Sequence, residues 1–559
     1  MQQHNLKITH ALITSFSVLA AFFTLYTFRT YDDNRLTSWE WVFDTVSVTR
    51  LIVPLCLGIA IAYLLSKTYL WATRPALFLC MLSFAAAVPF WSEPEVIVDA
   101  ARYFTQAKYL ELYGIDHFFG EWGRGIAPWT DMPLAPFLYG LIFRYFGETR
   151  VLIQLFTTAL FSLTVVLTYL IGRDLWDREV GFLGGMLLLG VPYLYTQVPL
   201  MLVDVLTMAC FTLAVFTFLK ALEKGGAWIP FASIALFCAF FSKYSTWPML
   251  SLPAIAAIVL MATKHHGVAP SEYLSRLGLV TLIAALPISA LVLLKHEVFT
   301  DQLRLLLAYQ KPGLKRWGES HISTFLFQIH PFITIAAVCS LFVALKRRDP
   351  RIIIAGWLLL LVVVLQIRRI RYIIMVFPML GLMASYGLVV IRNEAVRRFI
   401  TLSIVAASLV VALFGYLPYL RHLSTMNLKN AGAYLNTLED KDIEVFTLLP
   451  HDPVLNPAVN VPLLDLFTKK NIHYHDHADY SLPADDLATS ALRFTWEYRN
   501  PAYYEAQLHN GSAVVIISDK PDAEFPSEIA QRIKGGRDKK VFDIVDNIYR
   551  HQTVVTVYK

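Results

Sequence analysis

The stretch Phe90-Trp-Ser-Glu-Pro-Glu-Val-Ile-Val-Asp99 marks the point where an apolar segment ends and three carboxylates follow within seven residues. A carboxylate at the edge of hydrocarbon costs desolvation free energy unless it is paired, hydrated or used chemically. This cluster is therefore the first candidate for a functional site, and the apolar segments on either side of it define the fold.

The composition is that of a polytopic α-helical membrane protein. The 559 residues are 56% hydrophobic and 16% charged, and the mean hydropathy of +0.52 lies far above that of globular proteins. Runs of about 20 apolar residues, long enough to cross a bilayer, recur from Ile8 to about Tyr419 and then stop. The first run is too long for a signal-peptide core and lacks a cleavage pattern, so we expect it to remain as the first span.

Three parts are expected along the chain: two spans in 1–74, a membrane domain in 75–420 with external loops 92–149 and 295–321, and a soluble α/β domain in 421–559. About thirteen transmembrane helices are predicted, at 8–28, 47–65, 75–91, 150–172, 179–197, 200–219, 227–242, 244–263, 274–294, 322–345, 352–367, 372–391 and 398–420. The short segment 133–147 begins with a proline and carries Arg144, so we expect it to lie at the membrane interface.

The distribution of basic residues orients these spans, because cytoplasmic loops hold an excess of Lys and Arg. A cytoplasmic N-terminus places most basic loop residues inside: Lys67, Arg74, Arg173, Arg178, Lys220, Lys224, Lys264, the run from Lys346 to Arg351, Arg392, Arg397 and Arg398. An odd number of spans then puts the C-terminal domain outside the cytoplasm, in a multi-pass protein of the cell (inner) membrane. The net charge of +6 is no signal for nucleic acid, and all five cysteines lie in apolar spans, which indicates neither a disulfide framework nor a thiolate metal site.

Several ionisable residues fall on the external side, where chemistry on an extracytoplasmic substrate would occur. The pattern after Glu95 predicts an amphipathic interfacial helix whose N-terminal end would keep Glu93 and Glu95 ionised; the alternative is that they only cap the helix. Asp204 opens an apolar span, where acids are expensive, although it too could be a helix cap.

Basic residues are unexpectedly frequent on the same side. Arg368, Arg369 and Arg371 fall at the external end of their spans and Lys243 at an external turn. Such groups hold anions such as phosphate; the alternatives are a misplaced span boundary or snorkelling to lipid headgroups. The loop 295–321 adds Arg304, Lys311, Lys315 and Arg316.

In this order the motifs resemble the glycosyltransferase C superfamily, specifically the branch of protein O-mannosyltransferases and lipid A aminoarabinose transferases (family 39). Glu93-Pro-Glu95 stands where that family has Asp-Glu, and Val98-Asp-Ala-Ala-Arg-Tyr-Phe104 resembles its interfacial helix. Asp131-Met-Pro-Leu-Ala-Pro136 resembles its proline segment, and Asp204 matches its later Asp. Phe241-Ser-Lys-Tyr244 and Arg371-Tyr-Ile-Ile-Met-Val-Phe-Pro378 resemble two further motifs.

The resemblance implies transfer of one sugar from a polyprenyl-phosphate carrier to a lipid, glycan or protein acceptor, with inversion and without a metal or other cofactor. Glu93, or alternatively Glu95, would take the acceptor proton as general base, and Asp204 would orient its surroundings or the acceptor. Cations would stabilise the phosphate leaving group: Lys243 and Arg371, with Arg368 or Arg369. The remaining substrate-binding candidates are Asp99, Arg102, Asp131, Tyr244, Lys311 and Tyr372.

The C-terminal part predicts a small α/β domain that covers the active face or meets the acceptor. Strands are expected at 443–449, 513–518 and 553–558, with helical segments at 431–438 and 527–533. The histidines of Ile472-His-Tyr-His-Asp-His477 would share one face of a strand, but no fourth ligand is indicated, so we expect a solvated loop rather than a metal site.

Three rival functions are considered. A transporter or flippase also has many spans and membrane carboxylates, but no clear internal repeat is visible. An O-antigen ligase or polymerase also uses a lipid-linked donor, yet usually lacks this acidic loop and a large C-terminal domain. A receptor-like binding protein is the weakest alternative.

Overall fold

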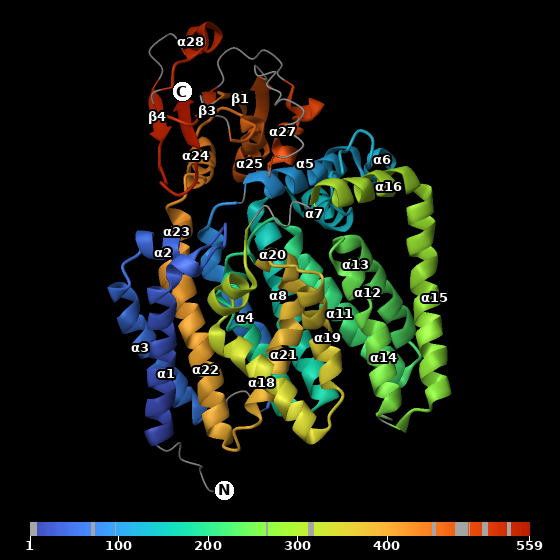
Figure 1. Cartoon of the computed structure of the whole chain (residues 1–559). Helices are drawn as coiled ribbons and strands as arrows, with labels where there is room; N and C mark the ends of the chain where they lie inside the picture. The colour runs from blue at the N-terminus through green and yellow to red at the C-terminus, as the bar shows by residue number, and fades with distance from the viewer. Residues whose placement is uncertain are drawn as a thin grey trace.

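The computed structural model describes residues 8–68, 73–95, 97–263, 267–310, 318–449, 454–475, 490, 492–505, 513–521, 523–533 and 538–559. A bundle of helices carries a small β-sheet domain at one end, and helix α1 (Ile8–Thr27) begins at the opposite end (Figure 1).

Eight helices among the described residues are long and apolar enough to cross a membrane, and each coincides with a predicted span. They are α1, α3 (Thr49–Ser66), the segment Pro75–Ser92 that contains α4 (Pro75–Ala87), α8 (Arg150–Leu175), α11 (Val203–Lys224), α15 (Pro270–Leu294), the segment Ile370–Leu388 that contains α20 (Ile370–Ile373) and α21 (Phe377–Leu388), and the segment Glu394–Arg421 that contains α22 (Glu394–Val411) and α23 (Leu417–Arg421). The multi-helix membrane fold is therefore confirmed.

The other five predicted spans are helical but shorter or interrupted. They correspond to α9 (Arg178–Leu188) with α10 (Pro192–Tyr195), α12 (Trp228–Ser242), α13 (Thr246–Met249) with α14 (Leu252–Ala262), the π-helical segment Ser323–Gln328 with α18 (Pro331–Arg347), and α19 (Ile352–Val364). Pro192, Pro253 and Pro331 each lie in the first turn of a helix, because proline lacks the N–H that would continue a preceding helix. The count of thirteen crossings stays a prediction.

The helices divide into a central and a peripheral set. The most apolar windows of α11 and of Ile370–Leu388 are each 94% buried, whereas that of α15 is 11% buried. Helix α15 stands at the edge of the bundle in Figure 1, and its exposed leucines suit contact with lipid. The central helices therefore bring their first residues, including Asp204 and Arg371, into the protein interior.

Short helices lie over the sheet end of the bundle. They are α5 (Ile97–Tyr113), α6 (Ile115–Glu121), α7 (Leu134–Phe146) and α16 (His296–Leu305); α5 and α16 run across that end in Figure 1. Helix α5 is the helix predicted after Glu95, and α7 matches the segment 133–147 predicted to lie at the interface.

The C-terminal domain contains a mixed five-stranded sheet in the order β2-β1-β3-β5-β4. Its strands are β1 (Asp442–Thr447), β2 (Asn471–His475), β3 (Ala513–Ser518), β4 (Lys539–Phe542) and β5 (Val554–Tyr558), accompanied by α24 (Met426–Leu435), α25 (Asn460–Phe467) and α28 (Ser527–Ile533). β1 pairs in parallel with β2 and β3, and β5 is antiparallel to β3 and β4. The predicted small α/β domain is confirmed.

One expectation about this domain is wrong. Residues 471–475 form edge strand β2 rather than a solvated loop, because they pair in register with β1. His473 Nε2, on β2, lies 3.0 Å from Asp442 Oδ1, on β1. His477 lies outside the described residues. Among the residues that the structure describes, no group of three His, Cys, Asp or Glu side chains is placed to hold a metal ion.

The C-terminal domain rests directly on the layer of short helices. Lys108 of α5 forms an ion pair with Asp465 of α25, and the Thr105 and Tyr498 hydroxyls lie 2.8 Å apart. Helix α5 thus connects the sheet domain to the acidic loop that precedes it.

Candidate active site

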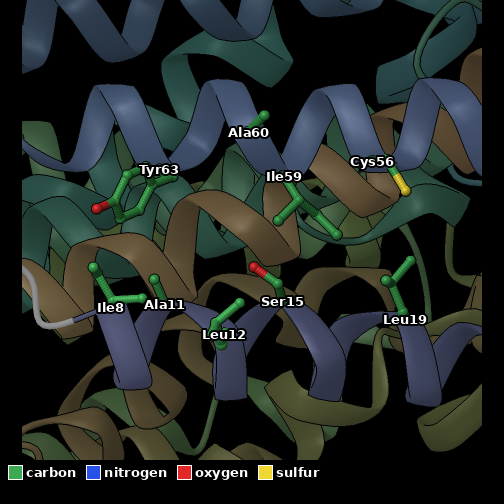
Figure 2. A pocket seen from close by; sticks show the side chains of 9 residues that line it. All are labelled: Ile8, Ala11, Leu12, Ser15, Leu19, Cys56, Ile59, Ala60 and Tyr63. Carbon is green, nitrogen blue, oxygen red and sulfur yellow. The ribbon is translucent and has the colours of Figure 1, made fainter.

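A cavity of about 1070 Å³ lies between the acidic loop, the outer ends of the central helices and the C-terminal domain. It is lined by ten of the thirteen predicted site residues: Glu93, Glu95, Asp99, Arg102, Asp131, Lys243, Tyr244, Arg369, Arg371 and Tyr372. A second cavity, of about 390 Å³ between α1 and α3, is lined by apolar residues and by Ser15, Cys56 and Tyr63, with no ionisable pair (Figure 2). The larger cavity is therefore the candidate active site.

Arg371, on α20, connects two of the predicted acids. Its Nε donates to Asp204 Oδ2 at 2.6 Å, and its Nη1 contacts Asp99 Oδ2. The Asp204 side chain is fully buried in the first turn of α11, whereas that of Asp99, in the first turn of α5, is 23% exposed. One guanidinium thus joins three helices.

Lys243 completes the pairing of Asp204, whose Oδ1 lies 2.6 Å from Lys243 Nζ. The ammonium of Lys243 and the guanidinium of Arg369 both lie over the Tyr372 ring, at 5.1 and 5.6 Å from its centre. Three cations therefore gather at one wall of the cavity, where the carboxylates of Asp99, Asp204 and Glu319 pair with them.

Arg102 links Asp99 to a further acid, Asp131. Its Nη2 lies 3.1 Å from both Asp99 Oδ1 and Asp131 Oδ1, and the Tyr103 hydroxyl also donates to Asp131. Asp131, the first residue of the segment that resembles the family's proline segment, thus pairs with Arg102.

Glu95 holds the acidic loop in place. Its Oε1 accepts from Arg150 Nε at 2.7 Å, and its Oε2 accepts from the backbone N–H of Met201 at 3.1 Å. Both side chains of the ion pair are buried. The carboxylate therefore ties the loop to α8 and to the segment before α11, and it does not cap α5.

Glu93 has a different environment from the other acids. The side chain is 1% exposed, and neither carboxyl oxygen has a hydrogen-bond partner among the described residues. Its backbone carbonyl, in contrast, accepts from Arg150 Nη1 at 2.6 Å.

Burial and neighbouring charges shift the pKa values of Glu93 and Asp99 in opposite directions, with different results. Burial raises the pKa of Glu93 well above its ordinary value, and Arg150 and Lys429 only partly oppose this. Burial also raises the pKa of Asp99, but the guanidinium groups of Arg371 and Arg102 outweigh it and bring the pKa below its ordinary value. Helix α5 begins at Ile97, so Glu93 lies outside its first turn, where the helix dipole acts; the expectation of an ionised Glu93 stays a prediction.

The other predicted site residues are Tyr244, Arg368 and Lys311. The Tyr244 hydroxyl donates to Gln302 Oε1. Arg368 is exposed, donates to Gln366 Oε1 at 3.2 Å and does not line the cavity, so Arg369 is the better candidate of that pair. Lys311, with Lys315 and Arg316, lies outside the described residues.

Sequence reasoning missed Arg150, Tyr103, Gln197 and Lys429. Arg150 had a detectable signal, because it is a basic residue at the external end of a predicted span, as are Arg368 to Arg371. Tyr103 lies within the motif Val98–Phe104, but its partner Asp131 is 28 positions away. Lys429 contacts the acidic loop more than 330 positions away, and Gln197 is an uncharged residue in an apolar segment with no pattern that singles it out.

Comparison with known proteins gives the following matches. Residues 128–290 match the family described as dolichyl-phosphate-mannose-protein mannosyltransferase. The fold is similar to ArnT from Cupriavidus metallidurans bound to undecaprenyl phosphate, at 13% identity and a TM-score of 0.52, over 86% of this chain and 97% of that chain. The apo state of the same protein gives 14% identity and a TM-score of 0.50, over 85% and 97% of the chains. Archaeal oligosaccharyltransferase AglB from Archaeoglobus fulgidus gives 11% identity and a TM-score of 0.45, over 81% of this chain and 70% of that chain. Among curated proteins, none matches the sequence.

The predicted resemblance is confirmed by sequence over residues 128–290 and by fold over most of the chain. The family match relates residues 128–290 by sequence to a glycosyltransferase family, and the fold over most of the chain is similar to that of ArnT. The matched segment, residues 128–290, begins just before α7 and ends within α15.

Proposed function

We propose that this protein transfers a single sugar from a polyprenyl-phosphate carrier to an extracytoplasmic lipid, glycan or protein acceptor by metal-independent inverting displacement. The observation that carries the proposal is Arg371, which contacts both Asp99 and Asp204 beside Lys243 in one large cavity. The family match and the ArnT-like fold support the donor class, since ArnT is solved with undecaprenyl phosphate bound.

The cations have a direct role in this reaction. The bond between the anomeric carbon and a phosphate oxygen breaks, and polyprenyl phosphate leaves with the bonding electrons. Arg371, Lys243 and Arg369 would contact the phosphate and stabilise its growing charge, which lowers the barrier because the interaction is strongest in the transition state.

Asp99 is our candidate for the general base, in preference to Glu93 and Glu95. The acceptor oxygen or nitrogen bonds to the anomeric carbon as its proton passes to a carboxylate. Asp99 is the predicted acid whose side chain is partly exposed and whose lowered pKa keeps it ionised. Burial raises the pKa of Glu93, which favours its protonated form, and Glu95 is paired with Arg150.

Donor binding would also activate this base. A phosphate that binds Arg371 competes with Asp99 for the same guanidinium, and the loss of that partner raises the proton affinity of Asp99. The carboxylate thus becomes a stronger base only when the donor is in place. Asp204, fully buried between Lys243 and Arg371, would position both cations.

The decisive experiment compares Asp99→Asn with the wild type in purified full-length protein, using a labelled polyprenyl-phosphate sugar. We expect sugar transfer to fall at least about a hundredfold, the usual contribution of a general base, while undecaprenyl phosphate still binds because Arg371 and Lys243 remain. Glu297→Gln, an exposed carboxylate on α16, is the matched control.

Two outcomes would contradict the proposal. The first is an Asp99→Asn variant that transfers sugar at the wild-type rate, which would contradict the role of Asp99 as the base. The second is movement of the labelled lipid across a bilayer without any sugar transfer, which would favour the transporter or flippase function.

A further inference from the structure

A group of buried polar atoms lines the cavity away from the Arg371 cluster. Both carboxyl oxygens of Glu93, Oε1 of Gln197 and Oγ1 of Thr425 are buried and have no hydrogen-bond partner among the described residues. All three residues line the cavity, and the side chains of Glu93 and Gln197 are 1% and 3% exposed. Unsatisfied buried polar atoms are uncommon, because each costs about 1–3 kcal/mol.

Three segments form this wall. The acidic loop is joined to the segment before α11 by the hydrogen bond from Met201 N to Glu95 Oε2. It is joined to the start of the C-terminal domain by Arg421, whose Nη2 lies 2.6 Å from Ser92 Oγ, and by Lys429, which contacts the Ser92 carbonyl. These contacts place Glu93, Gln197 and Thr425 on neighbouring segments.

The wall differs from the phosphate-binding cluster in its charged neighbours. The charged neighbours that shift the pKa of Glu93 are Arg150, Glu95 and Lys429. The charged neighbours that shift the pKa of Asp99 are Arg371, Arg102 and Arg369. Arg150 and Lys429 already donate to backbone carbonyls of the acidic loop. The wall thus offers mainly oxygen acceptors, which suits a ligand that supplies O–H or N–H donors rather than an anion.

We infer that Glu93, Gln197 and Thr425 form a second subsite, which binds the hydroxyl or amino groups of the donor sugar and so contributes to sugar specificity. The inference rests on the proposed function, and it assigns to Glu93 a binding role in place of the base role expected from sequence. The sugar is joined directly to the phosphate, so it must enter the same cavity, and its polar groups would satisfy the unpartnered atoms.

The raised pKa of Glu93 agrees with this role. A protonated carboxyl both donates and accepts a hydrogen bond, as a sugar hydroxyl does. A site built on such buried groups rejects an analogue that lacks the partner group, because its own polar atoms then stay unpaired.

The test measures binding to full-length protein in lipid nanodiscs. The probes are undecaprenyl phosphate alone and undecaprenyl phosphate linked to mannose, glucose or an aminopentose. In wild type, at least one sugar-bearing probe should bind more tightly than undecaprenyl phosphate. Glu93→Leu should lower the affinity for that sugar-bearing probe roughly tenfold or more. It should change the affinity for undecaprenyl phosphate less than twofold, and it should not lower the thermal unfolding midpoint. Glu93→Gln should recover part of the loss, and Glu297→Gln should bind as wild type does.

The inference is overturned if no sugar improves binding to wild type, if Glu93→Leu leaves the sugar-bearing probe unaffected, or if it weakens all probes equally. Failure of the proposed function is distinguishable, because undecaprenyl phosphate would then bind equally well to wild type and to Arg371→Met.

Discussion

Arg371 contacts Asp99 and Asp204 through different nitrogens of one planar guanidinium. The two carboxylates belong to different helices, so a single cation fixes the separation of α5, α11 and α20. An ammonium group is a point charge and does not reproduce this forked geometry. The contribution of Arg371 is therefore both positional and electrostatic.

This geometry predicts a graded response to substitution at position 371. Arg371→Met should abolish sugar transfer and destabilise the fold by about 3–5 kcal/mol, because it leaves buried carboxylates without their partner. Arg371→Lys should recover stability but little transfer. Thermal unfolding and transfer assays measure the two effects, and full activity of Arg371→Lys would show that charge alone suffices.

The pH dependence of the reaction distinguishes the acids. The base must be deprotonated, so kcat/KM falls as the pH drops through the pKa of that group in the free enzyme. Because neighbouring guanidinium groups lower the pKa of Asp99, we expect the acidic limb of kcat/KM to lie below about pH 4, the ordinary aspartate value. An acidic limb near neutral pH would instead indicate a buried carboxyl with a raised pKa. Burial raises the pKa of Glu93, and it raises the pKa of Glu319, the ion-pair partner of Arg369, to about 7.

At the scale of elements, close helix contacts hold the central helices together. Gly387 of α21 packs against α18 so closely that a Cβ atom would lie 2.0 Å from the backbone oxygen of Ala336. In membranes, small residues allow helix backbones to approach in this way. Gly278 of α15, by contrast, has no neighbour within 4 Å of a Cβ position.

These two glycines provide a matched pair for mutation. Gly387→Ala should destabilise the protein by about 1–3 kcal/mol through overpacking, and because α21 continues from α20 it should also reduce sugar transfer. Gly278→Ala should be neutral or stabilise by up to about 1 kcal/mol, as alanine favours helix. Thermal unfolding of both variants checks this, and equal effects would contradict the packing assignment.

At the scale of the whole molecule, the acidic loop and the C-terminal domain share one end of the bundle, and α22 begins at the opposite end (Figure 1). We propose that the sheet end is extracytoplasmic and the N-terminus cytoplasmic, as the excess of basic residues in the opposite loops indicates. The active cavity would then face acceptors outside the cell membrane.

Labelling of intact cells tests this orientation. In a background without native cysteines, a membrane-impermeant maleimide should label Asp116→Cys on α6 and should not label Arg392→Cys, which precedes α22; both positions are exposed. Lysed cells, in which both positions should react, are the control. The reverse pattern would invert the proposed topology.

Local composition and periodicity were enough to predict the membrane class, the positions of the long helices, three of the five strands and the grouping of acids and cations at one end of the helices. They did not reveal β2 and β4, which are short edge strands and depend on their partners. Which charges pair depends on the folded chain, because Asp99 and Arg371 are 272 positions apart and Asp204 and Arg371 are 167 apart. The tertiary structure also separated Asp99, partly exposed beside two guanidinium groups, from Glu93, buried without a partner, because desolvation and charge pairing depend on neighbours that the fold brings together.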